Sequence, residues 1–156
     1  MSYSSFVKQQ YKEYLKLNKN IILGFAASIC VSTVAAHLFS EQEAYLNATF
    51  TLVVDYVVYF TTFGGLYYID NRKKYRLESG ETDKISLRKD LIKIISSLGI
   101  GEVVYTIARW FLQYYFLTIG YDAYLASLVS QSTSTVIYML VVNISVKLTR
   151  LYKDGT

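Results

Sequence analysis

Residues 46–69, LNATFTLVVDYVVYFTTFGGLYYI, are almost entirely apolar, and their only charged residue is Asp55. A helix of about 20 apolar residues crosses the roughly 30 Å of hydrocarbon in a bilayer, so this stretch predicts a transmembrane helix. Three further stretches meet the same condition: 20–39, 91–119 and 123–146. They lack the sustained alternation of transmembrane strands. The sequence therefore predicts an all-α integral membrane protein, a bundle of four transmembrane helices within residues 20–152.

The composition supports this class and excludes several functions. Of the 156 residues, 53% are hydrophobic and 18% are charged, whereas soluble domains carry about 25% charged residues. One cysteine and one histidine cannot form a disulfide or the usual zinc, haem or copper sites. No nucleotide-binding loop or nucleophile-elbow motif is present. We therefore expect no metal, no cofactor and no enzymatic activity.

The basic residues predict the orientation of the chain. Of the 16 lysines and arginines, Arg109 alone lies deep inside an apolar stretch. The others lie in the N-terminal leader, around a basic loop at 70–90 and in the C-terminal tail, while the connections near 40–45 and 120–122 contain none. Because cytoplasmic loops are enriched in Lys and Arg, both termini and the basic loop are predicted to be cytoplasmic, in a multi-pass plasma-membrane protein. The net charge of +4 then indicates contact with anionic lipids and not with nucleic acid.

The leader, residues 1–19, has the pattern of an amphipathic helix. Apolar and aromatic residues recur at helical spacing, and lysines occupy another face. We predict a cytoplasmic helix lying in the headgroup plane, with a solvated helix that packs on a partner as the alternative. A cleaved signal peptide is disfavoured because both the leader and the first apolar stretch are too long.

Two parts of the chain resemble each other. Ala44-Tyr45-Leu46 matches Ala123-Tyr124-Leu125, and Val57-Val58-Tyr59 matches Val136-Ile137-Tyr138, both at an offset of 79 residues. The pattern predicts two similar two-helix repeats related by an axis along the membrane normal.

Three of the predicted spans carry polar residues at helical spacing, and such residues should face the interior of the bundle. The candidate polar core or binding site comprises Asp55, Tyr59, Glu102, Tyr105, Arg109, Gln131, Ser134 and Tyr138. Asp55 lies about 13 Å from the start of its span and Arg109 about 15 Å from the end of its span, at 1.5 Å per residue. Both of these ends face the same side of the membrane, so the similar depths predict an ion pair. Glu102 lies two turns deeper than Arg109, where Tyr59 or Tyr138 could donate a hydrogen bond to it.

Two interpretations of this cluster remain open. In the first, Glu102, Asp55 and Arg109 line a cleft that holds the headgroup of a cargo or relays a proton. In the second, Asp55 and Arg109 form a buried interhelical clamp, and Glu102 bonds to neighbouring hydroxyl groups. Ionisable residues inside a membrane favour the first, whereas a self-neutralising pair is typical of the second.

Motifs in the first and fourth spans resemble those of one family of small membrane proteins. They are Ile21-x-x-Gly24, Tyr124-Leu125-Ala126 and Asn143-x-x-x-Lys147-x-x-Arg150-Leu151-Tyr152. With these motifs and its layout, the chain resembles the GtrA / dolichol-phosphate-mannose-synthase transmembrane family, which has four spans, two similar halves and a basic middle loop. Ile144 stands where that family has phenylalanine, and its closing Trp-Val-Phe-like motif is missing. The resemblance implies handling of lipid-linked sugars, with Asn143 and Lys147 as the positions carried over.

Two functions fit these observations. The first is a transporter or flippase-like protein for a lipid-linked or small polar solute, which binds membrane lipids and forms a homo-oligomer. The second is a non-catalytic accessory subunit that stabilises a larger membrane enzyme complex, for example a membrane monooxygenase whose metal ligands come from other chains.

Overall fold

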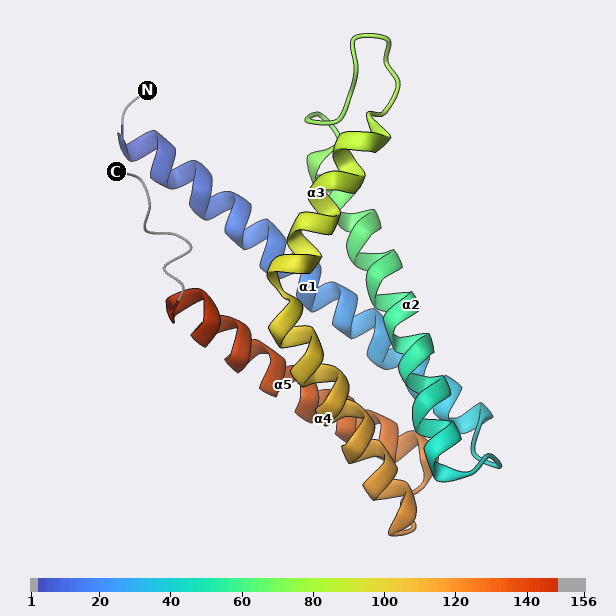
Figure 1. Ribbon diagram of the computed structural model, residues 1–156. Helices are drawn as coiled ribbons and strands as arrows, with labels where there is room; N and C mark the ends of the chain where they lie inside the picture. Colours follow the sequence, from blue (N-terminus) through green and yellow to red (C-terminus); the bar gives the residue numbers. More distant parts are fainter. Residues whose placement is uncertain (1–2, 149–156) are drawn as a thin grey trace.

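The computed structural model describes the backbone of residues 3–148 and, within it, the side chains of 15–96, 98–142 and 144. This part of the chain is all-helical, as predicted, and Figure 1 shows the arrangement of its elements. The helices are α1 (Tyr3–Leu38), α2 (Ala44–Asn71), α3 (Lys84–Ser97), α4 (Gly99–Thr118) and α5 (Ala123–Leu148). Three segments are long and apolar enough to cross a membrane, Leu15–Leu38, Ala44–Asn71 and Ala123–Val142, and α3 with α4 forms a fourth if the bent pair is one span.

Each of these segments turns one face inward, and buried residues recur on it at every fourth position. In α2 the row is Asn47, Thr51, Asp55, Tyr59 and Phe63; in α4 it is Gly101, Tyr105, Arg109 and Gln113. α1 and α5 carry comparable rows: Asn20, Gly24, Ser28, Ser32 and Ala36, and Ala126, Ser130, Ser134 and Tyr138. Rows of this spacing form the ridges by which helices pack at a steep crossing angle, and not the heptad seam of nearly parallel helices.

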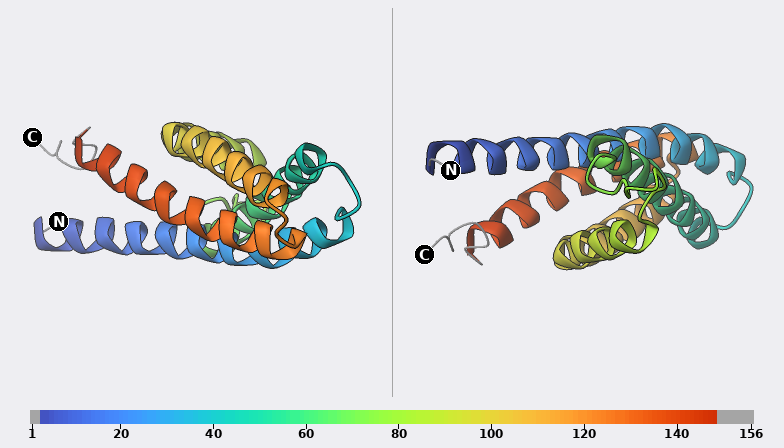
Figure 2. Two further views of the ribbon diagram at one scale, coloured as in Figure 1. Left: turned by 90° about the horizontal axis from the view of Figure 1, so that it is seen from below. Right: turned by 90° about the horizontal axis from the view of Figure 1, so that it is seen from above.

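The helices α1, α2, α4 and α5 form a closed set of contacts. α1 packs against α2 and α5, and α4 packs against α5 and α2. Figures 1 and 2 show that α2 crosses α1 obliquely and that α3 and the neighbouring connection project from one end. Close approach depends on small residues: a Cβ built on Gly24 would lie 3.0 Å from the Tyr59 ring, and one on Gly101 would lie 3.0 Å from the Tyr138 ring. Van der Waals contact of this kind is what drives helix association in lipid.

The segment expected as one span at 91–119 is bent. α3 ends at the cap residue Leu98, and α4 begins at Gly99, at an angle of 62° to α3. Serine and glycine near the junction, Ser96 and Gly99, weaken the helix, which is a common cause of sharp kinks. The first seven residues of α3 also belong to the predicted loop 70–90, so part of that loop is helical.

The predicted leader falls within the first helix. α1 runs without a break from Tyr3 to Leu38, so residues 3–19 and the first span form one helix. The amphipathic face predicted for the leader lies mostly on side chains outside the described set.

The connection between α2 and α3 is an ordered turn around one buried tyrosine. Tyr75 is 2% exposed, and its hydroxyl donates to Asp90 at 2.7 Å and lies 3.0 Å from the Tyr67 hydroxyl. Burial, together with the hydrogen bonds to Asp90 and Tyr67, raises the pKa of Tyr75 above its ordinary value. Residues 75–83, called the hairpin below, form a β-bridge between Arg76 and Thr82.

Substitution of a glycine in a close helix contact, compared with substitution of a glycine outside any contact, tests the packing. We expect Gly101→Leu to lower the free energy of unfolding by about 2 kcal/mol, since the side chain must displace the Tyr138 ring. Gly65→Leu is the matched control, because nothing lies within 4 Å of a Cβ at Gly65, and it should leave stability unchanged or raised. Trp110 fluorescence during denaturation in detergent measures both, because the indole donates to Thr49 of α2 at 3.0 Å. Equal stability of the two variants would contradict the packing.

Candidate functional site

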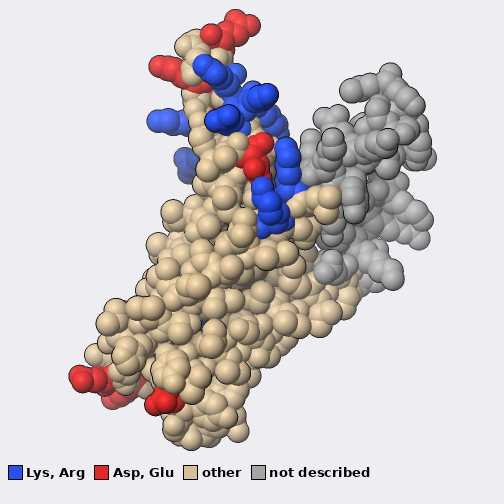
Figure 3. Space-filling view, turned by 180° about the vertical axis from the view of Figure 1, so that it is seen from behind, with Lys and Arg blue, Asp and Glu red and all other residues tan. Residues whose placement is uncertain are grey.

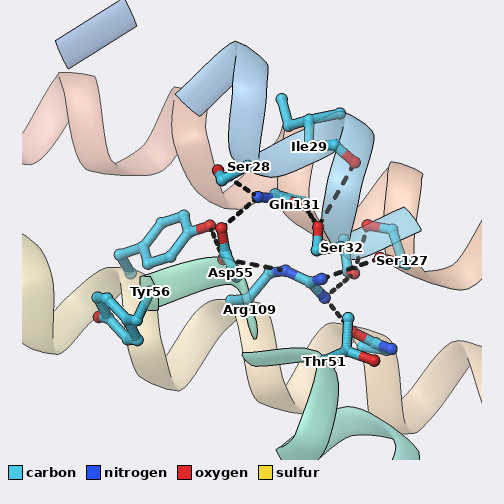
Figure 4. Close-up of polar contacts among 12 residues, drawn as sticks. Ser28, Ile29, Ser32, Thr51, Asp55, Tyr56, Arg109, Ser127 and Gln131 are labelled. Carbon is cyan, nitrogen blue, oxygen red and sulfur yellow. Dashed lines mark hydrogen bonds and ion pairs between the residues drawn. The ribbon is translucent and has the colours of Figure 1, made fainter. Parts of the chain in front are cut away.

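The centre of the bundle is a cluster of buried polar side chains built around the carboxylate of Asp55. Asp55 is 1% exposed; Tyr105 donates to its Oδ2 at 2.5 Å, and Gln131 Nε2 donates to its Oδ1 at 2.6 Å. The predicted ion pair is present, with Arg109 Nε 3.8 Å from Oδ2. Figure 4 shows Asp55 lying between Gln131 and Arg109. The ion pair therefore joins α2 to α4, and Gln131 joins α2 to α5.

The guanidinium of Arg109 is enclosed by hydroxyl and amide oxygens. Nη1 donates to Ser130 at 2.7 Å and to the Gln113 side chain, and Nη2 donates to Ser127 at 3.0 Å. Nε makes no hydrogen bond and faces the Asp55 carboxylate. A buried cation in hydrocarbon needs such partners, because an unpaired arginine near the middle of a span costs roughly 2.5–3.5 kcal/mol on insertion scales.

Two serines of α1 complete the cluster, and the sequence interpretation missed them as hydrogen-bonding residues. Gln131 Nε2 donates to Ser28 at 3.0 Å, and Ser32 donates to the Gln131 side-chain oxygen. The sequence shows these serines as part of a stripe of small residues, which predicts close packing but not a bond to α5. Ser28 and Ser32 follow Gly24 at intervals of four residues, so they share its face of α1 and lie opposite Gln131. Asp55, Tyr105, Arg109, Gln131, Ser28, Ser32, Ser127 and Ser130 together are called the polar core below.

Asn47 and Gln113 extend the polar core toward the end of the bundle where α1 meets α2. Asn47 Nδ2 donates to the backbone oxygens of Ala36 and Phe39, at 2.9 and 2.8 Å, and so satisfies carbonyls at the end of α1. Its Oδ1 accepts a hydrogen bond from Gln113 Nε2 at 2.8 Å. The sequence alone does not predict this role of Asn47, because it depends on the position of the neighbouring helix end.

Tyr59 and Tyr138 belong to a second cluster, which is apolar and lies nearer the hairpin. The Phe25 ring lies 4.6 Å from that of Tyr59 and 5.2 Å from that of Tyr138, between centroids. Tyr105 is 5.3 Å from the Phe25 ring and is also in the polar core, so it joins the two clusters. Phe25, Tyr59, Phe63, Tyr105 and Tyr138 are called the aromatic core below. The structure thus separates Tyr59 and Tyr138 from the ion pair.

Four of the predicted site residues have buried polar atoms without a hydrogen bond to any described residue. They are Glu102 through Oε2, Arg109 through Nε, Ser134 through Oγ and Tyr138 through its hydroxyl group. The Glu102 carboxylate interacts with the Tyr138 and Tyr56 hydroxyl groups, but Oε2 itself has no hydrogen bond of good geometry, so the predicted bond to Glu102 stays a prediction. The backbone oxygen of Glu102 accepts from Thr106 at 2.7 Å, and the Thr106 hydroxyl lies 2.5 Å from that of Tyr56.

The side chains of Asn143 and Lys147, carried over from the family resemblance, lie outside the described set. Among the described residues, no group of three or more His, Cys, Asp or Glu side chains could hold a metal ion.

Comparison with known proteins adds no assignment to this geometry. No family model, curated protein or solved structure matches the chain. The likeness to the GtrA family stays a prediction from the sequence. In this geometry the charged groups of the polar core contact each other and other side chains of the same bundle.

A double-mutant cycle tests whether Asp55 and Arg109 act as one unit. Each single change, Asp55→Leu or Arg109→Leu, leaves a buried charge unpaired and should cost about 3–5 kcal/mol of stability. The double variant Asp55→Leu/Arg109→Leu should cost clearly less than the sum, because neither charge remains. The free energy of unfolding in detergent or bicelles gives the coupling. Additive effects would show that the two side chains do not interact.

Proposed function

We propose that this chain is a non-catalytic membrane subunit that packs against a larger integral membrane protein. The observation that carries the proposal is the state of the polar core: Asp55 and Arg109 are 1% and 0% exposed, and their partners are side chains of the same chain. A cargo site needs polar groups that face a space the cargo can enter. Groups that bond to one another instead hold the helices together.

The outward face of α2 supplies a surface suited to a partner helix. Thr61 and Gly65 lie four residues apart and are exposed, and no atom lies within 4 Å of a Cβ built on Gly64 or Gly65. Pairs of small residues at this spacing allow another transmembrane helix to approach closely, and transmembrane helices commonly associate through such faces. We assign the partner to this face.

The charge distribution supports the proposed orientation. In Figure 3 the Lys and Arg side chains gather, together with several acidic ones, at the end that carries the hairpin and α3, whereas the charged side chains at the opposite end are acidic. Under the positive-inside rule, the basic end faces the cytoplasm together with the start of α1 and the end of α5. A plasma-membrane protein surrounded by anionic lipids fits this arrangement.

The packing also supports a duplication. Gly24 of α1 contacts Tyr59 of α2, and Gly101 of α4 contacts Tyr138 of α5. The two tyrosines are the residues that match at the offset of 79, so each two-helix unit repeats one glycine-on-tyrosine contact. The α1–α5 and α2–α4 contacts exchange under a twofold axis that relates the two units.

Isolation of the tagged chain from its native membranes tests the proposal. In a mild detergent it should co-purify with a larger membrane protein at constant stoichiometry, measured by quantitative mass spectrometry. Gly65→Leu should lower the recovered partner by about fivefold or more, since the added side chain separates the two helices. Ala26→Leu, at an exposed small residue of α1, is the matched control and should leave recovery unchanged. A chain that purifies alone would contradict a subunit function.

A second function is favoured by one observation, the buried Oε2 of Glu102, which has no hydrogen bond to any described residue. Its carboxylate, the Ser134 hydroxyl and the Tyr138 hydroxyl offer hydrogen-bonding capacity that the polar core does not use. In a carrier for a lipid-linked or small polar solute, acting as a homo-oligomer, these groups would bind the cargo or pass a proton.

Glu102→Gln distinguishes the two functions. For a carrier, we expect assembly and stability to be unchanged and pH-dependent transport into reconstituted vesicles to be lost, because the amide cannot titrate. For a subunit, transport is absent in the wild type, and the variant should differ from it only in stability or in recovery of the partner. Flux of the same pH dependence in wild type and variant would exclude a titrating Glu102.

A further inference from the structure

A pocket of about 360 Å³ lies where α2 ends and the hairpin begins. It is separate from the polar core, and three of its six lining residues are basic. The lining residues are Tyr68, Arg72, Lys73, Arg76, Gly80 and Thr82, and they are called the basic pocket below.

The walls of the basic pocket are held by hydrogen bonds within the hairpin and to α2. The hydroxyl groups of Tyr68 and Thr82 lie 2.8 Å apart and tie the hairpin to α2. Leu77 N donates to the Glu81 oxygen at 2.8 Å, and Gly80, with φ of +86°, forms the tight turn between them. The buried Tyr75 fixes the base of the hairpin. The three cations are thus presented by an ordered scaffold.

The cations of the basic pocket lack acidic partners, whereas nearby lysines have them. Lys74 pairs with Asp90 at 2.6 Å, and Lys19 pairs with Asp70 at 2.7 Å. No ion pair joins the three basic pocket residues to any other residue that the structure describes. Asp83, the next acid after the pocket, accepts a hydrogen bond from Ser86 N at 3.0 Å at the start of α3. The residues that line the basic pocket therefore include three cations and no acid, while Glu78 and Glu81 lie elsewhere on the hairpin.

Its position along α2 places the basic pocket at the level of lipid headgroups. Twenty residues of helix, counted from Leu46, cover about 30 Å and end near residue 66, so the hydrocarbon ends just before Tyr68. Exposed apolar side chains flank the basic pocket: Ile69 is 61% exposed and Leu77 is 47% exposed. A ligand with a phosphate and an attached apolar chain matches this combination of cations and apolar flanks.

We propose that the basic pocket binds the phosphate group of an anionic membrane lipid, with the acyl chains along the flank formed by Ile69. Arg72 and Arg76 supply planar guanidinium groups, which bind phosphate oxygens through two parallel hydrogen bonds. Lys73 adds a further charge. Basic residues beside a span attract anionic lipids in general, but an ordered pocket binds one headgroup at a defined place.

Lipid binding to the purified full-length chain, measured by native mass spectrometry with phosphatidylglycerol, tests the proposal. The triple variant Arg72→Gln/Lys73→Gln/Arg76→Gln should weaken binding of the first lipid by about tenfold or more. The matched control Lys84→Gln/Arg88→Gln/Lys89→Gln removes the same charge from exposed positions of α3, outside the basic pocket, and should change it by less than about threefold. Equal losses in the two variants would overturn the proposal in favour of general attraction.

Two further arms identify the source of the phosphate and guard against misfolding. Millimolar inorganic phosphate should not displace the lipid, and displacement would show that a free phosphate ion is the ligand. A photoreactive phosphatidylglycerol added to the wild-type chain should label the peptide containing residues 68–82, and labelling confined to α3 would overturn the proposal without any variant. This test is independent of the subunit function, since it needs no partner protein.

Discussion

The structure depends on the need to neutralise Asp55 inside a low-dielectric environment. Its Oδ2 accepts from Tyr105 and faces Arg109, both on α4, and its Oδ1 accepts from Gln131 on α5. Gln131 in turn contacts Ser28 of α1. One carboxylate on α2 therefore links all four spans, directly or through one amide. In water these hydrogen bonds would compete with bonds to solvent. In hydrocarbon the loss of these bonds would leave the Asp55 charge without a partner, so this arrangement of the helices is favoured over others.

The bonds of the polar core require a close approach that only small residues permit. The rows at four-residue spacing bring Gly24 under the Tyr59 ring and Gly101 under the Tyr138 ring, so the backbones approach closely at the aromatic core. This sets the neighbouring serines of α1 within reach of Gln131. Steep crossing then lets the helices diverge away from the contact, and α3 and the hairpin project from the bundle. The packing of the aromatic core and the hydrogen bonds of the polar core therefore both depend on the same close approach of the helices.

The sequence predicts what depends on periodicity and depth along a helix. The all-helical class follows from the apolar stretches, and the Asp55–Arg109 pair follows from similar depths. It does not predict which faces of different helices meet, so Ser28, Ser32 and Asn47 were missed as hydrogen-bonding partners. The bend at Leu98 was not predicted, because the apolar composition continues across it. The orientation, the duplication and the role of Glu102 stay predictions.

The ion pair also bears on why two similar units would share one chain. Under the proposed duplication, Ser134 is the counterpart of Asp55 at the offset of 79, and Ser32 is the counterpart of Arg109 at the offset of 77 that relates Gly24 to Gly101. The charged pair therefore occurs once, and hydroxyl groups stand at its symmetric positions. A symmetric pair of identical units would place two acids and two bases around one axis, with like charges close together in hydrocarbon. Fusion into one chain allows the two units to diverge, so that a single acid on one and a single base on the other join them.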